Sequence, residues 1–176
     1  RLVCSEGTYE QLKLPQDDPL LFWEGDSFVL GDVPVGTAPT PHDCFGSCCY
    51  LFGEGDGSLA YCTDLGSVTA DIFRLIRKGK NLFIESNHDV DMLKNGPYPY
   101  QLKQRVLSGS GHLSNADCAG IVSRLVLEGT ERVMLGHLSE TNNRPQLAIG
   151  ESTNALKQMG AQNDVLLGAA AAKEMQ

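Results

Sequence analysis

Apolar and polar positions follow two different periods along the chain. Up to about residue 62 they form short apolar or alternating runs separated by glycines and prolines, a pattern typical of antiparallel strands. A capping box at residues 8–11 predicts a short helix in this part, and the glycine-rich segment 53–57 predicts the loop of a hairpin. The strand predictions cover residues 2–4, 20–23, 27–30, 33–37, 49–52 and 59–62.

Beyond residue 62, strand-like apolar runs alternate with helical spacing. Apolar residues three and four apart predict helices near residues 72–76 and 121–127, with Thr69 and Ser114 as their N-caps. Hairpin strands followed by strand–helix alternation predict an α/β sandwich with mixed sheets. Further helices are expected at 90–94, 100–107 and 145–159, and strands at 82–84, 132–135 and 165–167.

Composition narrows the class of protein. The 176 residues are enough for one domain with its own core, and no apolar run is long enough to span a bilayer. A net charge of −8 argues against a general nucleic-acid binder, which is normally basic, but allows an enzyme with a local basic patch. The six cysteines come without a secretory signal, so we expect reduced thiols in a cytoplasmic protein.

Candidate chemistry gathers where the predicted strands end. His42, Asp64, His88 and His137 each follow a different predicted strand. Imidazole and carboxylate groups along one edge of a sheet suit zinc, manganese or iron, and Asp64, lying between imidazole-bearing loops, has the chemistry to bridge two cations. Each group also has an ordinary interpretation as a turn residue, a loop polar group or a helix cap.

Six ordered motifs resemble those of the metallo-β-lactamase-fold hydrolases, and within them most nearly the YycJ/WalJ branch of nuclease-like proteins, relatives of the ribonuclease Z and ribonuclease J groups. The resemblance runs from the first strand to about residue 150. It implies an αββα sandwich with mixed sheets. The motifs are PHD at 41–43, YCTDLG at 61–66, ESNHD at 85–89, GPYPY at 96–100, GHLSN at 111–115 and HLSETNN at 137–143.

The resemblance also implies a role for each candidate residue. His42 corresponds to a ligand of a first metal ion, His137 to a ligand of a second, and Asp64 to the ligand that bridges them, so the implied cofactor is two divalent ions, zinc or manganese. His112, with Asp64, is catalytic: it stabilises charge near the scissile phosphate or passes a proton to the leaving oxygen. Glu85, His88 and Asp89 fall where residues support the ligands or face the substrate, and Lys94, Lys103 and Arg105 are either phosphate-binding or ordinary solvated charges.

One defining motif of the family, His-x-His-x-Asp-His, does not occur in the sequence. We expect it upstream of residue 1, so that residues 1–176 are a single, incomplete metallo-β-lactamase-like domain, the C-terminal part of the fold with its N-terminal strands missing. Without those strands, sheet edges and part of the core would be exposed.

The activity implied for the intact parent is metal-dependent phosphodiester hydrolysis, as a DNA exonuclease with nucleic acid as its partner and no membrane. Two alternatives stay open. One is a small-molecule phosphodiesterase or thioester hydrolase of the same fold, and the other is an inactive fragment with no competent metal centre. The sequence does not predict the native metal, exonuclease against endonuclease action, or the oligomeric state.

Overall fold

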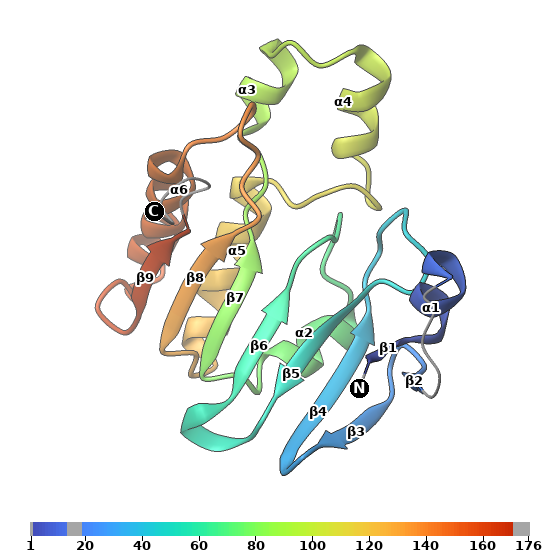
Figure 1. Ribbon diagram of the computed structural model, residues 1–176. Helices are drawn as coiled ribbons and strands as arrows, with labels where there is room; N and C mark the ends of the chain where they lie inside the picture. The colour runs from blue at the N-terminus through green and yellow to red at the C-terminus, as the bar shows by residue number, and fades with distance from the viewer. Residues whose placement is uncertain (1, 14–18, 171–176) are drawn as a thin grey trace, which may run out of the picture.

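A computed structural model of the chain describes residues 2–13 and 19–170, which form one large sheet with helices on it and a small sheet beside it (Figure 1). The strands are β1 (Val3–Ser5), β2 (Leu20–Phe22), β3 (Ser27–Leu30), β4 (Val33–Pro39), β5 (Cys48–Phe52), β6 (Leu59–Cys62), β7 (Asn81–Glu85), β8 (Arg132–Gly136) and β9 (Leu166–Ala169). The helices are α1 (Glu6–Leu12), α2 (Ala70–Ile76), α3 (Val90–Asn95), α4 (Tyr100–Val106), α5 (Asn115–Leu127) and α6 (Pro145–Gln158).

The large sheet has the order β3-β4-β5-β6-β7-β8-β9 and is mixed. Strands β3 to β6 pair antiparallel, whereas β6 to β9 pair parallel. The change falls at β6, where the sequence changes from hairpin patterns to strand–helix alternation. The predicted α/β class with a mixed sheet is therefore confirmed.

Two local predictions near the N-terminus are wrong. Strand β2 was expected among antiparallel strands, but it pairs parallel with β1, from which helix α1 separates it in the sequence. The first helix also begins earlier than the capping box at residues 8–11 implied. Ser5 is its N-cap and accepts a hydrogen bond from the Thr8 backbone N–H, so Thr8 lies inside the helix.

Helices cover one face of the large sheet, and strand alternation places the core there (Figure 1). On β6, β7 and β8, every second residue is buried beneath these helices, and these apolar side chains join those of α2, α5 and α6 in one cluster. Thr69 and Ser114 cap α2 and α5 as predicted, each accepting a hydrogen bond from a first-turn N–H. The buried strand residues include Ala60, Cys62, Leu82, Ile84, Val133 and Leu135.

The opposite face of the same strands is open and apolar. The alternate residues Tyr61 and Phe83 stack with ring centroids 4.8 Å apart, and Met134 beside them is 43 % exposed. A shallow groove of about 550 Å³ runs across β6 to β9, lined mainly by apolar side chains. Within residues 2–13 and 19–170, one large sheet is present where the predicted αββα sandwich has two.

Helices α3 and α4 form an arm, residues 90–106, that projects beyond the sheet edge at which β6, β7 and β8 end (Figure 1). The arm is attached through buried Leu93 and Val106. None of the helices in the described part of the chain combines the length and the apolar character that crossing a bilayer requires.

Candidate active site

Four strands deliver polar side chains to the edge beneath the arm. Strand β4 runs in the same direction as β6, β7 and β8, because each of the two pairings between β4 and β6 is antiparallel. Their carboxyl ends therefore meet at one edge. His42 follows β4, Asp64 follows β6, Glu85 ends β7 and His137 follows β8. His112 joins them from the loop before α5.

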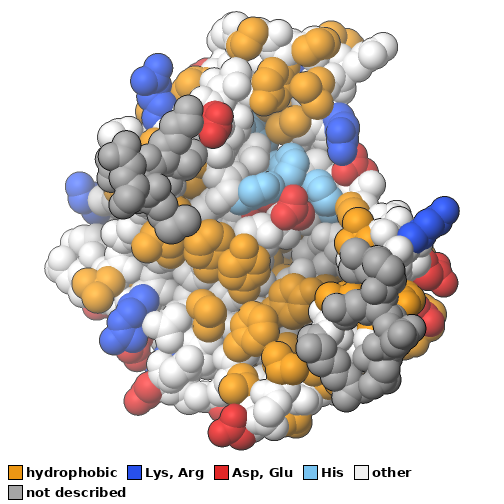
Figure 2. All heavy atoms as spheres, in the orientation of Figure 1, with side chains coloured by type: hydrophobic (Ala, Val, Ile, Leu, Met, Phe, Trp, Pro, Cys, Tyr) orange, Lys and Arg blue, Asp and Glu red, His pale blue; other side chains and the backbone are white. Residues whose placement is uncertain are grey.

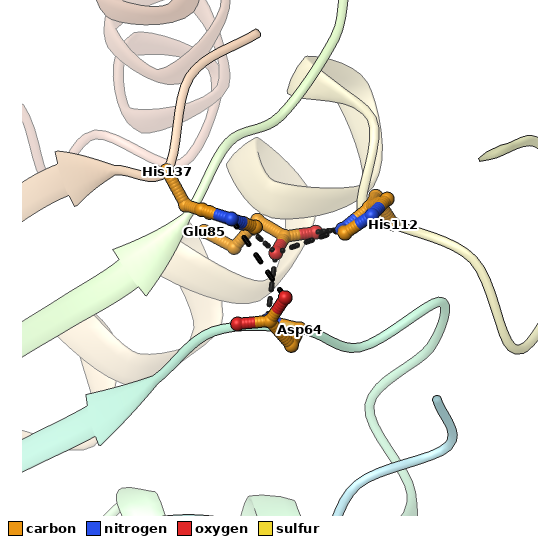
Figure 3. Close-up of side chains that lie close together, drawn as sticks. All are labelled: Asp64, Glu85, His112 and His137. Atoms are coloured by element: carbon orange, nitrogen blue, oxygen red, sulfur yellow. Dashed lines mark hydrogen bonds and ion pairs between the residues drawn. The ribbon is translucent and has the colours of Figure 1, made fainter. Parts of the chain in front are cut away.

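Glu85 holds this group together (Figure 3). Its fully buried carboxylate accepts hydrogen bonds from the backbone N–H groups of Asp64, at 2.7 Å, and Leu113, at 2.8 Å. It also contacts Nδ1 of His112 at 3.1 Å and Nδ1 of His137 at 2.6 Å. Because an ionised carboxylate can only accept, Nδ1 of each ring must carry the hydrogen. One side chain thus holds four of its neighbours.

The position of the ring hydrogen can be assigned in the same way for the third imidazole, His42. Nδ1 of His42 lies 3.1 Å from the carbonyl oxygen of Gly111, which again can only accept. All three rings therefore present Nε2 with a free lone pair. Nε2 of His42 and Nε2 of His137 each lie 3.7 Å from Oδ1 of Asp64, so this carboxylate stands between two imidazoles.

This donor set fits divalent metal ions. Asp64, Glu85, His112 and His137 offer ligand atoms that lie within 4.8 Å of one another. Glu85 is the least suited of the four as a ligand, because both of its oxygens are already committed to hydrogen bonds. A ligating histidine whose other ring nitrogen donates to a carboxylate or a carbonyl is the usual arrangement around protein-bound zinc and related metals. Imidazole nitrogen with carboxylate oxygen is a ligand combination suited to such ions.

Two of these residues have an uncommon backbone conformation. Asp64 has φ of 57° and His137 has φ of 53°, in the left-handed region that non-glycine residues seldom adopt. Such strain persists where surrounding contacts hold it, and it is concentrated at functional sites. Here the Glu85 carboxylate supplies those contacts, through the backbone of Asp64 and the ring of His137.

Electrostatics reinforces the geometry. Burial alone raises the pKa of Glu85, but its hydrogen bonds with His112 and His137 outweigh burial and bring the pKa below its usual value. The hydrogen bond with Glu85 raises the pKa of His137 against the opposing effect of burial. Glu85 therefore stays ionised beside the rings that it orients.

A buried amide network ties together the loops that carry these residues. The Asn143 side-chain amide donates to the backbone carbonyls of Ser86, at 2.7 Å, and Asn87, at 3.0 Å. Asn143 and Asn115 also exchange hydrogen bonds between their side chains at 2.9 Å. Asn87 in turn donates to the carbonyl of His137 at 3.0 Å. The ends of β7 and β8 and the start of α5 are thus fixed relative to one another.

Gly111 lets the His112 loop pack tightly against the arm. A Cβ atom at this position would lie 2.2 Å from the carbonyl oxygen of Arg105, closer than atoms can approach. The missing side chain brings the Gly111 carbonyl to His42 and the next residue, His112, to Glu85.

The other predicted residues lie at or near the site in different ways. His88 is 1 % exposed, its ring nitrogens have no hydrogen-bond partner in the described part of the chain, and burial lowers its pKa. Asp89 is the N-cap of α3, accepting from Met92 N–H, which is the ordinary helix-cap interpretation of this residue. Arg105 forms an ion pair with Asp43, and Nζ of Lys103 donates to the carbonyl of Lys94. Both basic side chains lie on the arm.

The site opens into a cleft of about 530 Å³ with two unlike walls. One, the sheet-edge wall, consists of the three imidazoles and Asp64. The other, the arm wall, is made by Tyr98, Leu102 and Val106. In Figure 2, hydrophobic side chains on the arm lie directly next to the pale-blue histidines and the acidic group beneath them. Asn87 and residues 138–141, after β8, complete the lining.

Sequence patterns pointed to the site residues but missed the central position of Glu85 and the amide network. Glu85 is the last residue of an apolar strand, and a carboxylate there is a sign that a buried polar partner is needed. Asn143 lies in a motif of the family resemblance, yet only the fold shows which backbone groups it reaches.

Comparison with known proteins agrees with the sequence resemblance. The chain is 36 % identical over 148 residues to a protein named exodeoxyribonuclease YycJ from Bacillus anthracis, an alignment that covers 84 % of this chain and 56 % of the relative. It is 35 % identical over 164 residues to a protein named exodeoxyribonuclease WalJ from Streptococcus pneumoniae, covering 89 % and 61 %. The chain thus spans less than two thirds of the length of these relatives. No protein-family model matches it.

Solved structures of low sequence identity share the fold. The metallo-β-lactamase fold protein YhfI from Bacillus subtilis superposes with a TM-score of 0.63 at 15 % identity, covering 96 % of this chain and 61 % of that one. Zinc-bound PqqB from Methylobacterium extorquens superposes with a TM-score of 0.59 at 16 % identity, covering 97 % and 62 %. The chain therefore has the metallo-β-lactamase fold, and its sequence is similar to those of the YycJ and WalJ proteins.

Proposed function

We propose that this site takes part in hydrolysis of phosphodiester bonds in nucleic acid, with DNA as the substrate and exonuclease action as the mode. The observation that carries the proposal is the Glu85-centred cluster, in which three imidazoles and Asp64 turn ligand or proton-transfer atoms toward one cleft. The names of the YycJ and WalJ relatives supply the substrate class. A cytoplasmic location goes with this proposal and is supported by six free cysteines.

The proposal gives each residue a role that follows from its position. His42, Asp64 and His137 would hold the two divalent ions, zinc or manganese, that the sequence resemblance implies. Such ions, when bound, activate water and neutralise charge on the phosphate. His112 lies on the opposite side of Glu85 from His137, and its Nδ1 is held by the carboxylate. The Nε2 lone pair of His112 would therefore first take up a proton, and the imidazolium beside Glu85 would then give that proton to the leaving oxygen. Glu85 keeps that ring in the required tautomer.

We also propose that residues 1–176 are one part of a metallo-β-lactamase-like domain, completed by further strands. The open face of the sheet supports this. Leu59, Tyr61, Met134 and Leu166 present apolar surface there, and contiguous apolar patches on soluble proteins are usually covered by a partner surface. The limited coverage of the YycJ and WalJ relatives agrees with this interpretation.

A single-turnover assay tests the proposed function. The chain is supplied in excess over end-labelled DNA, RNA and a small thioester, with manganese or zinc, and compared with His112→Gln. We expect slow release of nucleotides from DNA that is lost in His112→Gln. Thioester hydrolysis without DNA cleavage would contradict the proposal. No hydrolysis of any substrate would favour the alternative of a chain without a competent centre.

A further inference from the structure

The arm wall has features that the hydrolytic chemistry does not require. Tyr98 is half-buried and lines the cleft together with Leu102, opposite the histidines. Within the described residues, Tyr98 forms no hydrogen bond, ion pair or ring contact, and it lines the cleft. An aromatic side chain that lines a catalytic cleft without a partner in the protein is suited to contact a ligand.

We propose that Tyr98 stacks on an unpaired terminal nucleobase of the substrate strand, while the phosphate next to that base lies at the sheet-edge wall. This inference rests on the proposed function and specifies its substrate as a single-stranded or frayed end. A nucleotide has a charged phosphate and an apolar, flat base, and the cleft offers an imidazole-lined wall and an apolar aromatic wall to match them. Its volume of about 530 Å³ falls in the range of small-ligand sites.

The preference for an unpaired base follows from the geometry of nucleic acids. Inside a duplex, neighbouring base pairs cover both faces of each base, whereas an unpaired terminal base has a face free for an aromatic side chain. Stacking of this kind tolerates any base, because every base has a π-face. It therefore suits an enzyme that removes successive nucleotides regardless of sequence.

The charge of the chain favours a contact of this kind. With a net charge of −8, the chain gives little long-range attraction for a polyanion. Near the cleft, Arg105 is already paired with Asp43, which reduces its attraction for phosphate. Base stacking contributes affinity for a single strand that does not depend on charge.

Binding in EDTA tests the proposal without any hydrolysis. The probe is a ten-nucleotide DNA with 2-aminopurine as its terminal base and a dye at the far end, offered in both polarities. We expect the 2-aminopurine fluorescence to be quenched on binding at one end. In Tyr98→Ala the quenching should disappear, with binding weakened by about 5-fold to 100-fold, and Tyr98→Phe should restore both.

Tyr100→Ala is the matched control, since Tyr100 lies two residues away on the same arm, is 74 % exposed and does not line the cleft. An oligonucleotide with an abasic terminus should bind wild type and Tyr98→Ala equally. Competition by dAMP separates binding of a free nucleotide from binding of a strand end, and the proposal predicts that dAMP competes only weakly. Full competition by dAMP at the strand's own dissociation constant would overturn the assignment to a strand end.

Three further results would overturn the proposal. These are equal effects of Tyr98→Ala and Tyr100→Ala, equal loss with abasic and normal termini, or blunt duplex binding as tightly as single strands. The outcome is separable from the proposed function, because stacking is measured without metal. Tyr98-dependent quenching together with no metal-dependent cleavage would refute hydrolysis and leave the base contact standing. Metal-dependent cleavage that does not depend on Tyr98 would support hydrolysis and refute the base contact.

Discussion

The two walls of the cleft are built in opposite ways. On the sheet-edge wall, Glu85 is fully buried and its hydrogen bonds fix Asp64, His112 and His137 at the ends of strands. On the arm wall, Tyr98 belongs to a short projecting segment and makes no polar contact within the described chain. The difference shows that hydrogen bonds fix the polar side chains of the sheet-edge wall, whereas Tyr98 in the arm wall is held without such bonds in the described chain.

The largest expected effect is a loss of metal affinity on removing the Asp64 carboxylate, which lies between two imidazoles. Asp64→Asn replaces the carboxylate that lies 3.7 Å from Nε2 of both His42 and His137. We expect the affinity for zinc or manganese to fall more than about 100-fold, beyond the usual effect of a residue that only supports ligands. Isothermal titration calorimetry measures it. Glu140→Gln, an exposed carboxylate lining the same cleft, is the control and should leave affinity unchanged.

A smaller effect, on the free energy of unfolding, is expected at Gly111, where the His112 loop packs against the arm. Gly111→Ala places a Cβ atom 2.2 Å from the Arg105 carbonyl oxygen, so the loop must shift. Overpacking of this kind costs about 1–3 kcal/mol, and urea unfolding would detect it. Gly109→Ala, two residues away with nothing within 4 Å of its new Cβ, should be nearly neutral. If both substitutions were equally destabilising, the close contact between arm and sheet edge would not be what holds the loop.

The smallest expected effect on stability is at Arg105, on the arm. Arg105→Ala removes an exposed ion pair with Asp43, and solvent-exposed ion pairs contribute little to stability. The melting temperature should hardly change. If Arg105 contacts a phosphate in the bound strand, the salt dependence of oligonucleotide binding should lose about 0.7 from its slope. An unchanged slope would leave Arg105 as a partner of Asp43 alone.

The positions of the candidate residues at strand ends were predictable, and the organisation of the site was not. Alternating strand patterns placed His42, Asp64 and His137 at strand ends, and parallel strands bring such ends to one edge of a sheet. The central role of Glu85 depends on the order β6-β7-β8, which puts the end of β7 between those of its neighbours. Strand order arises from long-range pairing that periodicity does not encode.

His88 and Asp89 also show that sequence patterns do not predict how each polar residue is used. Both belong to a motif of the family resemblance, and both were expected to support the ligands or face the substrate. Asp89 instead caps α3, and His88 is buried without a hydrogen-bond partner in the described part of the chain. Sequence identifies a polar cluster, but burial and partners decide which member faces the cleft.

The central claim is that Glu85 makes the site by orienting imidazoles for metal ions, and Glu85→Gln tests it most directly. The amide keeps the size of the side chain, but its NH₂ group turns donors toward the Nδ1–H groups and backbone N–H groups that the carboxylate now accepts from. Zinc or manganese affinity measured by calorimetry should fall about 10-fold to 100-fold, with the helical circular dichroism retained. Wild-type affinity in a folded Glu85→Gln protein would contradict the account.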